Sequence, residues 1–168
     1  RFHRVGLTAG KPVWVEADPA RVDQILSNLV SNAVKYTPDG GEVRVSVDQD
    51  GGWAHLIVRD TGAGIPPSGL PHRFDLLYQA HSDPSDRRGG LGIGLTLVRH
   101  VAQLHGGTVT AASGGPGAGS LFTVTLPTIP PPDAAPRSAA KPAAPRARRV
   151  LVVAEGGGAP EMLGVVLA

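Results

Sequence analysis

The sequence lacks cysteine altogether, and aromatic side chains make up only 4% of its 168 residues. The absence of cysteine excludes disulfides, cysteine-ligated zinc, iron–sulfur clusters and thiol catalysis. No apolar run approaches the roughly 18 residues of a membrane span, and no signal-peptide pattern opens the chain. We therefore expect a cytoplasmic domain that makes no membrane contact of its own, within a parent that is either soluble or membrane-anchored. Because the first residue is Arg1 rather than methionine, we also expect a piece of a longer protein.

Charged residues are also few, at 18%, and their distribution limits the choice of partners. The formal net charge is +2, yet residues 1–126 hold eleven basic and eleven acidic side chains, so the whole excess lies in residues 127–168. A domain that binds nucleic acid carries its positive charge on the folded part. The charge pattern therefore argues against nucleic acid as a partner.

Composition divides the chain into three parts. Residues 127–149 contain seven prolines, many alanines and almost no large apolar side chain, which is typical of an extended, semi-rigid linker. We predict a domain over residues 1–127, a basic Pro/Ala-rich linker over 128–148 and the truncated start of a second domain over 149–168. Within that last part, residues 149–153 are predicted to form a short strand and residues 159–168 to begin a helix.

Hydrophobic periodicity predicts the elements of the main domain. A capping carboxylate at Asp18, followed by proline at the first helical position, marks the start of a helix. The predicted elements are a strand over 12–16, a helix over 19–36, strands over 42–48 and 53–60, a helix over 93–104, and strands over 108–112 and 121–126. This order predicts an α+β fold, a two-layer sandwich of a mixed, largely antiparallel sheet with helices on one face.

A polar face lies on the first predicted helix. At 100° per residue, Asn28, Asn32 and Lys35 fall within about 60° of one another, about a third of a turn from the apolar stripe. An amide oxygen suits Mg²⁺, which keeps most of its waters and takes few protein ligands. A lysine beside it matches phosphate oxygens. By itself the face is more typical of a solvated helix surface.

A single carboxylate followed by spaced glycines ends the second of the paired strands, at Asp60-Thr61-Gly62-Ala63-Gly64-Ile65. An ionised carboxylate accepts well from an exocyclic amine such as that of adenine, and glycines let a flat ligand approach the backbone. A plain turn has the same residues. The segment alone therefore leaves both interpretations open.

Two further glycine-rich segments accompany it. Gly89–Leu95 opens the second helix, where backbone N–H groups form a phosphate site without any side chain. A charged loop rather than a strand precedes it, which excludes a dinucleotide fold, and the Gly-Lys-Ser/Thr of a P-loop is missing. Gly117–Ser120 leads into the last strand and is also consistent with a simple hairpin turn.

Taken in order, four segments strongly resemble the ATP-binding catalytic domain of sensor histidine kinases: NLVSNAVKYTPDGGEV, VRDTGAGIPP, GGLGIGLTLV and GPGAGSLFTVTLP. These kinases belong to the GHKL superfamily, with DNA gyrase and MutL, and share its Bergerat-type fold. The resemblance covers nearly all of residues 1–127. It implies Mg-ATP as the nucleotide, a phosphoacceptor-histidine dimerisation domain as partner, and a response regulator or receiver domain downstream in two-component signalling.

The resemblance also implies roles for individual residues. Asn32 would hold Mg²⁺, Asn28 would line the phosphate side, and Lys35 would contact phosphate. Asp60 would accept from the adenine amino group, with Tyr36 nearby. The remaining implied nucleotide-binding residues are Gly62, Gly64 and Ile65 on the adenine wall, Gly90, Gly92, Gly94 and Leu95 around the triphosphate, and Thr123 completing the adenine side. Residues 66–89 would form the ATP lid.

Asn28 distinguishes among members of the superfamily. The ATPases carry a glutamate at the equivalent turn to activate water, whereas an amide cannot take a proton. Asn28 and Lys35 would instead present the γ-phosphate to another nucleophile, which favours a kinase over a water-using ATPase. A nucleotide-binding regulatory module without turnover is the principal alternative.

The chain also departs from the family pattern. Phe74 matches the lid anchor, but Leu77 replaces the usual second phenylalanine. None of the six histidines precedes an acidic residue, so the acceptor histidine is expected elsewhere in the parent protein. RRVLVVAEGGGAPEML resembles the first strand and helix of a receiver domain, as in hybrid histidine kinases, yet Ala154-Glu155 stands where receivers carry paired acids. No receiver activity is assigned.

Overall fold

The computed structural model describes residues 3–78, 92–131, 150–153 and 164–167 of the chain. Its elements are β1 (Arg4–Ala9), α1 (Pro19–Tyr36), β2 (Glu42–Asp50), β3 (Trp53–Asp60), the 3-10 turn η1 (Pro67–Gly69), α2 (Gly94–Leu104), β4 (Thr108–Ala112), β5 (Ser120–Pro127), β6 (Val150–Val153) and β7 (Gly164–Leu167). Both α-helices and the five strands β1–β5 begin and end within the first two of the described ranges.

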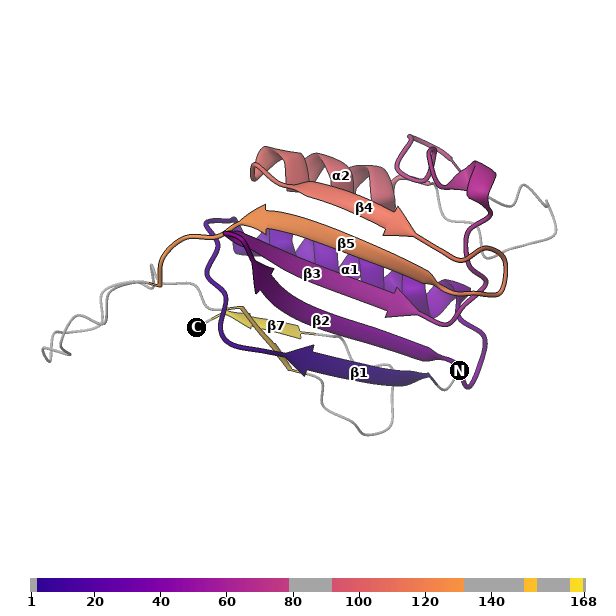
Figure 1. The fold of residues 1–168 in the computed structure, drawn as a ribbon, viewed down its shortest axis with the longest axis horizontal. Helices are drawn as coiled ribbons and strands as arrows, with labels where there is room; N and C mark the ends of the chain where they lie inside the picture. The colour runs from indigo at the N-terminus through magenta and orange to yellow at the C-terminus, as the bar shows by residue number, and fades with distance from the viewer. Residues whose placement is uncertain (1–2, 79–91, 132–149, 154–163, 168) are drawn as a thin grey trace, which may run out of the picture.

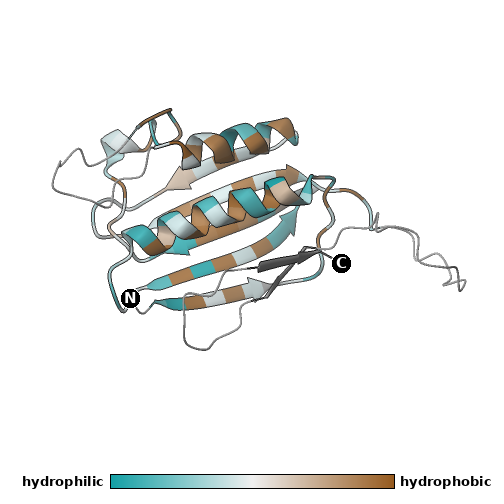
Figure 2. Ribbon diagram, turned by 180° about the vertical axis from the view of Figure 1, so that it is seen from behind, coloured by the Kyte–Doolittle hydropathy of each residue, from teal (hydrophilic) through white to brown (hydrophobic). Residues whose placement is uncertain are grey.

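The five strands form one mixed sheet in the order β1-β2-β3-β5-β4 (Figure 1). β1 runs parallel to β2, and the other neighbouring strands are antiparallel. Both α-helices lie on the same face of the sheet, as the two opposite views show (Figures 1 and 2). The predicted fold class, an α+β two-layer sandwich, is confirmed.

α1 follows the sequence prediction at both ends. The Asp18 carboxylate accepts a hydrogen bond from the Ala20 N–H at 2.9 Å, and Pro19 occupies the first turn. At the other end, the Thr37 N–H donates to Ala33 O, and the backbone becomes extended. A stripe of α1 is buried, at Ile25, Leu26, Leu29 and Ala33.

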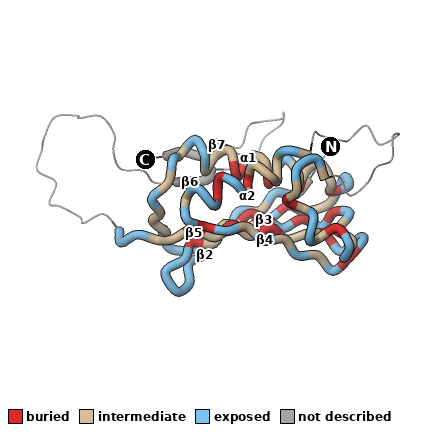
Figure 3. Tube along the Cα trace, turned by 90° about the horizontal axis from the view of Figure 1, so that it is seen from above, coloured by how far each residue is buried: buried red, intermediate tan, exposed pale blue. Residues whose placement is uncertain are grey.

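The hydrophobic core lies between this stripe, α2 and one face of the sheet (Figure 3). Alternate residues of the strands enter it, because successive side chains of a strand point to opposite faces. The buried strand residues are Val43 and Val45 on β2, Ala54, Val58 and Asp60 on β3, and Phe122, Val124 and Leu126 on β5. Asp60 is the one carboxylate buried among the described residues, and it lies at the end of its strand.

The predicted strand over residues 12–16 is wrong. The first strand is β1, and Val15 contributes only an isolated bridge to Thr128. Pro12 has no N–H to donate to a neighbouring strand, whereas each of residues 4–9 pairs with a residue of β2. Val5 and Leu7 of β1 are 46% and 38% exposed. Because neither side chain is buried in the core, the strand is defined by its pairing with β2 rather than by burial.

The C-terminal segment confirms one expectation and corrects another. β6 coincides with the predicted strand, but β7 lies where a helix was expected to continue. The two pair antiparallel, with Val150 opposite Leu167, so a valine-rich partner strand overrides a helical interpretation. The predicted linker, residues 128–148, lies outside the described residues from 132 onward.

The main domain extends slightly beyond its predicted end at residue 127. The Thr128 N–H donates to Gly52 O and the Ile129 N–H donates to Trp14 O, both at 2.9 Å. We expect a chain ending at Pro127 to unfold about 4–8 °C below a chain ending at Pro131, since it loses both bonds. Thermal unfolding followed by circular dichroism measures the difference. Equal midpoints would place the boundary at residue 127.

Candidate functional site

The carboxylate of Asp60 is held in a fixed orientation by neutral donors. It is 4% exposed. Its Oδ1 accepts from the Gly62 N–H at 2.8 Å and from the Ser120 N–H at 3.2 Å, and its Oδ2 accepts from the Ser120 hydroxyl. Among the described residues no cation forms an ion pair with it. Hydrogen bonds to an ionised group are the strong ones, so these three donors offset the cost of burial.

Ser120, which sequence analysis did not name as a site residue, contacts the Asp60 carboxylate, whereas Thr123 lies farther along β5. Ser120 pairs with Asp60 in the register of β3 and β5, whereas Thr123 pairs with Ile57. Phe122 is buried on the helix side, so Thr123 points to the open face of the sheet. Counting back in twos from Phe122 along the strand reaches Ser120, a signal already present in the sequence.

The turn after Asp60 packs against the end of α1. A Cβ added at Gly62 would lie 2.4 Å from the Tyr36 carbonyl oxygen, which leaves no room for a side chain. The same oxygen accepts from the Ala63 N–H at 3.0 Å. The last residue of α1 and the Asp60 turn are therefore joined through the backbone.

The loop between β4 and β5 packs against this turn and is hydrogen-bonded to it. Gly64 has a φ of +69°, and a Cβ there would lie 2.1 Å from Gly115 O. The Gly117 N–H donates to Ala63 O at 2.7 Å. Predicted glycine-rich segments that are about fifty residues apart in the sequence thus form one wall.

The Ser113 side chain forms hydrogen bonds that stabilise the same loop. Its hydroxyl accepts from the Ile65 N–H at 3.0 Å and donates to Gly119 O at 2.6 Å. Ile65 itself is 1% exposed and belongs to the core. The hydroxyl therefore joins the predicted wall residue to the loop that carries Ser120.

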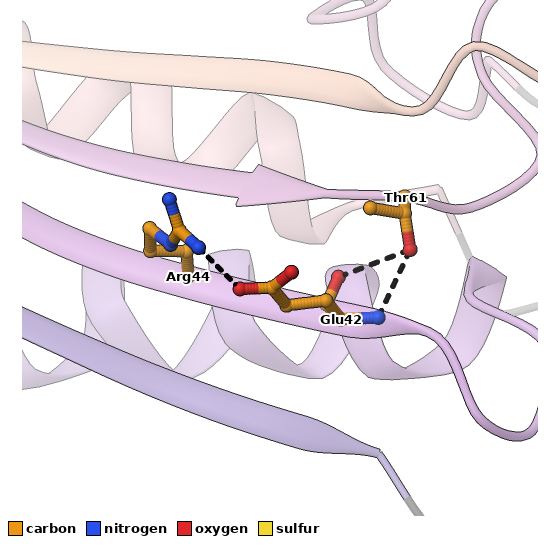
Figure 4. A network of polar contacts seen from close by, with 3 residues as sticks. All are labelled: Glu42, Arg44 and Thr61. Atoms are coloured by element: carbon orange, nitrogen blue, oxygen red, sulfur yellow. Dashed lines mark hydrogen bonds and ion pairs between the residues drawn. The ribbon is translucent and has the colours of Figure 1, made fainter.

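A polar network closes the strand ends next to the site (Figure 4). The Thr61 N–H donates to Glu42 O at 3.0 Å, and the Thr61 hydroxyl accepts from the Glu42 N–H at 2.9 Å. The Glu42 carboxylate forms an ion pair with Arg44. These contacts hold the end of β3, where Asp60 lies, against the start of β2.

The polar face of α1 meets the beginning of α2. The Asn28 amide donates to Gln24 O at 2.8 Å, so its nitrogen is bound within its own helix. Its Oδ1 faces α2, where a Cβ added to Gly94 would come within 3.0 Å of it. Asn32 and Lys35 are partly buried on the same face of α1. The first and third predicted segments therefore lie together.

The first turn of α2 is uncapped by any side chain. Gly92, just before it, has a φ of +70°, and a Cβ there would lie 2.9 Å from Leu77 Cα. Leu95 packs against the core and places the first turn against α1. Gly90 and the later part of the predicted lid, from residue 79, lie outside the described residues.

The described part of the predicted lid is anchored by one phenylalanine. Phe74 is buried, and its ring meets Phe122 edge-on with centroids 6.3 Å apart. Leu77, which replaces the family's second phenylalanine, is 62% exposed and has a φ of +61°. The substitution therefore leaves an apolar side chain in solvent.

Tyr36 is approached by two cations. The Lys35 ammonium lies 4.8 Å from the ring centroid, and the Arg73 guanidinium carbon lies 5.8 Å from it. Both distances are typical of a cation over an aromatic ring. Arg73 had no role in the sequence prediction, because nothing in its local sequence pairs it with residue 36.

Within the described ranges no three His, Cys, Asp or Glu side chains group as a metal site. None of the helices in those ranges is long and apolar enough to cross a membrane.

The sequence was compared with models of known protein families and with known proteins. The sequence model of the family described as histidine kinase-, DNA gyrase B-, and HSP90-like ATPase matches residues 17–130. The phosphate regulon sensor protein PhoR of Pseudomonas aeruginosa is 42% identical over 123 residues, which are 73% of this chain and 28% of PhoR. The signal transduction histidine-protein kinase AfsQ2 of Streptomyces coelicolor is 43% identical over 130 residues, 77% of this chain and 24% of AfsQ2. The chain thus spans about a quarter of the length of these relatives.

Two solved structures resemble the fold. The mycobacterial sensor histidine kinase MprB has a TM-score of 0.67 at 29% identity, covering 76% of this chain and 85% of that one. Full-length ShkA in complex with AMPPNP has a TM-score of 0.63 at 30% identity, covering 75% of this chain and 26% of that one.

Proposed function

Because this chain belongs to the family of histidine kinase-, DNA gyrase B- and HSP90-like ATPases, we propose that it binds Mg-ATP and transfers the γ-phosphoryl group to a histidine outside residues 1–168. The observation that carries the proposal is the buried Asp60 carboxylate, oriented by three neutral donors beside a wall of glycine backbone. The relatives PhoR and AfsQ2 match 123 and 130 residues of this chain, and AfsQ2 is named a histidine-protein kinase.

Adenine recognition would depend on Asp60 Oδ2. Oδ1 already accepts two backbone N–H groups, so Oδ2, with one hydroxyl donor, is the oxygen that remains for the adenine amino group. Ser120 takes the place in this proposal that the sequence assigned to Thr123. The Gly62–Gly64 turn and Tyr36 would border the base.

The phosphates would lie between the two helices. Asn32 and Lys35 on α1 face the side on which Asn28 meets Gly94, and the N–H groups of the first turn of α2 have no side-chain cap. One amide oxygen from Asn32 fits Mg²⁺, which completes its shell with water and phosphate oxygens. When bound, Mg²⁺ would neutralise charge on the transferring phosphoryl group.

Asn28 favours transfer of the γ-phosphoryl group to the acceptor histidine over hydrolysis of ATP. Its amide nitrogen donates to Gln24 O, and an amide has no basic site that could take a proton from water. The chain's residues would bind and orient ATP, while the nucleophile is an imidazole nitrogen of the acceptor. The bond between the γ-phosphorus and the bridging oxygen breaks, a P–N bond forms, and ADP leaves with the electron pair.

The proposal is tested in two steps. Titration of Mg-ATP into the chain by calorimetry measures binding, and γ-labelled ATP with an acceptor-histidine domain from a relative such as AfsQ2 measures transfer. Saturable binding followed by label on the acceptor supports the kinase. Binding without transfer to any acceptor tried favours a regulatory nucleotide-binding module, and rapid phosphate release by the chain alone would favour an ATPase.

Substitution of Asn32 by alanine is expected to weaken Mg-ATP binding about tenfold or more, because it removes the proposed metal ligand. The Mg²⁺ dependence of ATP affinity should disappear in the same variant. Calorimetric titrations with and without excess EDTA measure both effects. An exposed residue of the same helix, Ser31, provides the control Ser31→Ala. An unchanged dependence on Mg²⁺ in Asn32→Ala would assign the metal to other groups.

A further inference from the structure

Arg73 reaches the end of α1 from the described part of the predicted lid. It directly precedes Phe74, whose burial against Phe122 fixes the backbone at this point. The Arg73 N–H donates to Leu70 O at 3.3 Å. From this position the guanidinium extends to the Tyr36 ring. The burial of its neighbour Phe74 thus places the Arg73 backbone, and the guanidinium lies over the Tyr36 ring.

Within the described ranges, the charge of Arg73 has no acidic partner. Its Nε is buried and has no hydrogen-bond acceptor in the described part of the chain. No described carboxylate forms an ion pair with Arg73 or with Lys35, although both cations lie over the same ring. A buried donor without an acceptor costs free energy, and two cations near one another repel. An anion bound beside Tyr36 would relieve both costs.

The position of Tyr36 indicates which anion. Tyr36 lies four residues after Asn32 and therefore one turn along the same helix face. Its backbone carbonyl accepts a hydrogen bond from the Ala63 N–H in the turn after Asp60. Along the backbone, Tyr36 thus lies between the proposed metal ligand and the turn that carries the proposed adenine acceptor, where the phosphates of a bound nucleotide would pass.

We propose that Arg73 binds the phosphates of the nucleotide together with Lys35, with the Tyr36 ring supporting both cations. The inference rests on the proposed function and adds a residue to it. A guanidinium presents its N–H groups as a planar fork that matches two phosphate oxygens, which an ammonium does not. Arg73 would therefore recognise the phosphate chain, and the base would not depend on it.

The test compares Arg73→Met with the wild-type chain, using calorimetric titration of ATP, ADP and adenosine. Methionine keeps much of the apolar side chain over Tyr36 and removes the charge. We expect ATP and ADP to bind about tenfold more weakly, and adenosine to bind as before. Arg59→Met removes the same charge from an exposed position on β3, and it should leave all three affinities unchanged.

Other results would overturn the inference. Equal losses for ATP and adenosine would show that Arg73 only supports the Tyr36 ring, and unchanged affinities in Arg73→Met would show that it does neither. If the wild-type chain fails to bind ATP, the proposed function fails and this inference fails with it. Arg73→Gln, with thermal unfolding as a check, serves as the second variant if methionine prevents folding.

Discussion

An Asp60→Ala variant is expected to lose at least about 100-fold in affinity for ATP. The substitution removes the proposed acceptor for the adenine amino group, and it leaves the Gly62 N–H, the Ser120 N–H and the Ser120 hydroxyl without their acceptor. Each unsatisfied buried donor costs about 1–3 kcal/mol. Calorimetric titration with Mg-ATP measures the affinity, and thermal unfolding shows how much stability is lost in parallel.

Two further variants separate binding from stability. Asp60→Asn keeps an oxygen for the backbone donors but replaces the other oxygen by an amide NH₂ group, a donor that cannot accept a hydrogen bond from the adenine amino group. It should therefore lose most of the affinity with a smaller loss of stability than Asp60→Ala. Ser120→Ala removes only the hydroxyl and is expected to cost about tenfold in affinity. ATP binding that survives in Asp60→Asn would remove Asp60 from adenine recognition.

Gly64→Ala is expected to destabilise the domain by about 2–5 kcal/mol. Alanine is strained at a φ of +69°, and its Cβ would overlap the Gly115 carbonyl oxygen at 2.1 Å. The loop between β4 and β5 has to move away from the Asp60 turn, and it carries Ser120 with it. ATP affinity should therefore fall together with the unfolding midpoint, as measured by titration and by thermal unfolding.

Gly51 offers a matched control in the turn between β2 and β3. Its φ is +55°, yet nothing lies within 4 Å of an added Cβ. Gly51→Ala thus imposes the backbone strain without the overlap, and it should cost only about 1–2 kcal/mol and leave ATP affinity intact. Equal destabilisation by the two substitutions would mean that the contact between Gly64 and Gly115 contributes nothing.

Sequence analysis correctly predicted the elements with strong local signals. α1 has a capping aspartate, a proline in its first turn and an apolar stripe at helical spacing, so its ends depend on neighbouring residues alone. β3 and β5 alternate clearly, and their predicted ranges differ from the structure by one residue or less at each end. The segments of the candidate site were also found in sequence, because turns and helix starts demand glycine, asparagine and aspartate locally.

Local sequence is thus sufficient to indicate the family, the helix faces and the glycine-rich segments around Asp60. Three further points depend on contacts between distant segments. β1 forms a strand because it pairs in parallel with β2. Ser120 rather than Thr123 contacts Asp60 because of the register between β3 and β5. Arg73 lies over the Tyr36 ring because its neighbour Phe74 is buried against Phe122. The reason is the same in each case. A partner distant in the chain supplies the hydrogen bonds or the packing, and local sequence does not specify which distant segment that partner is.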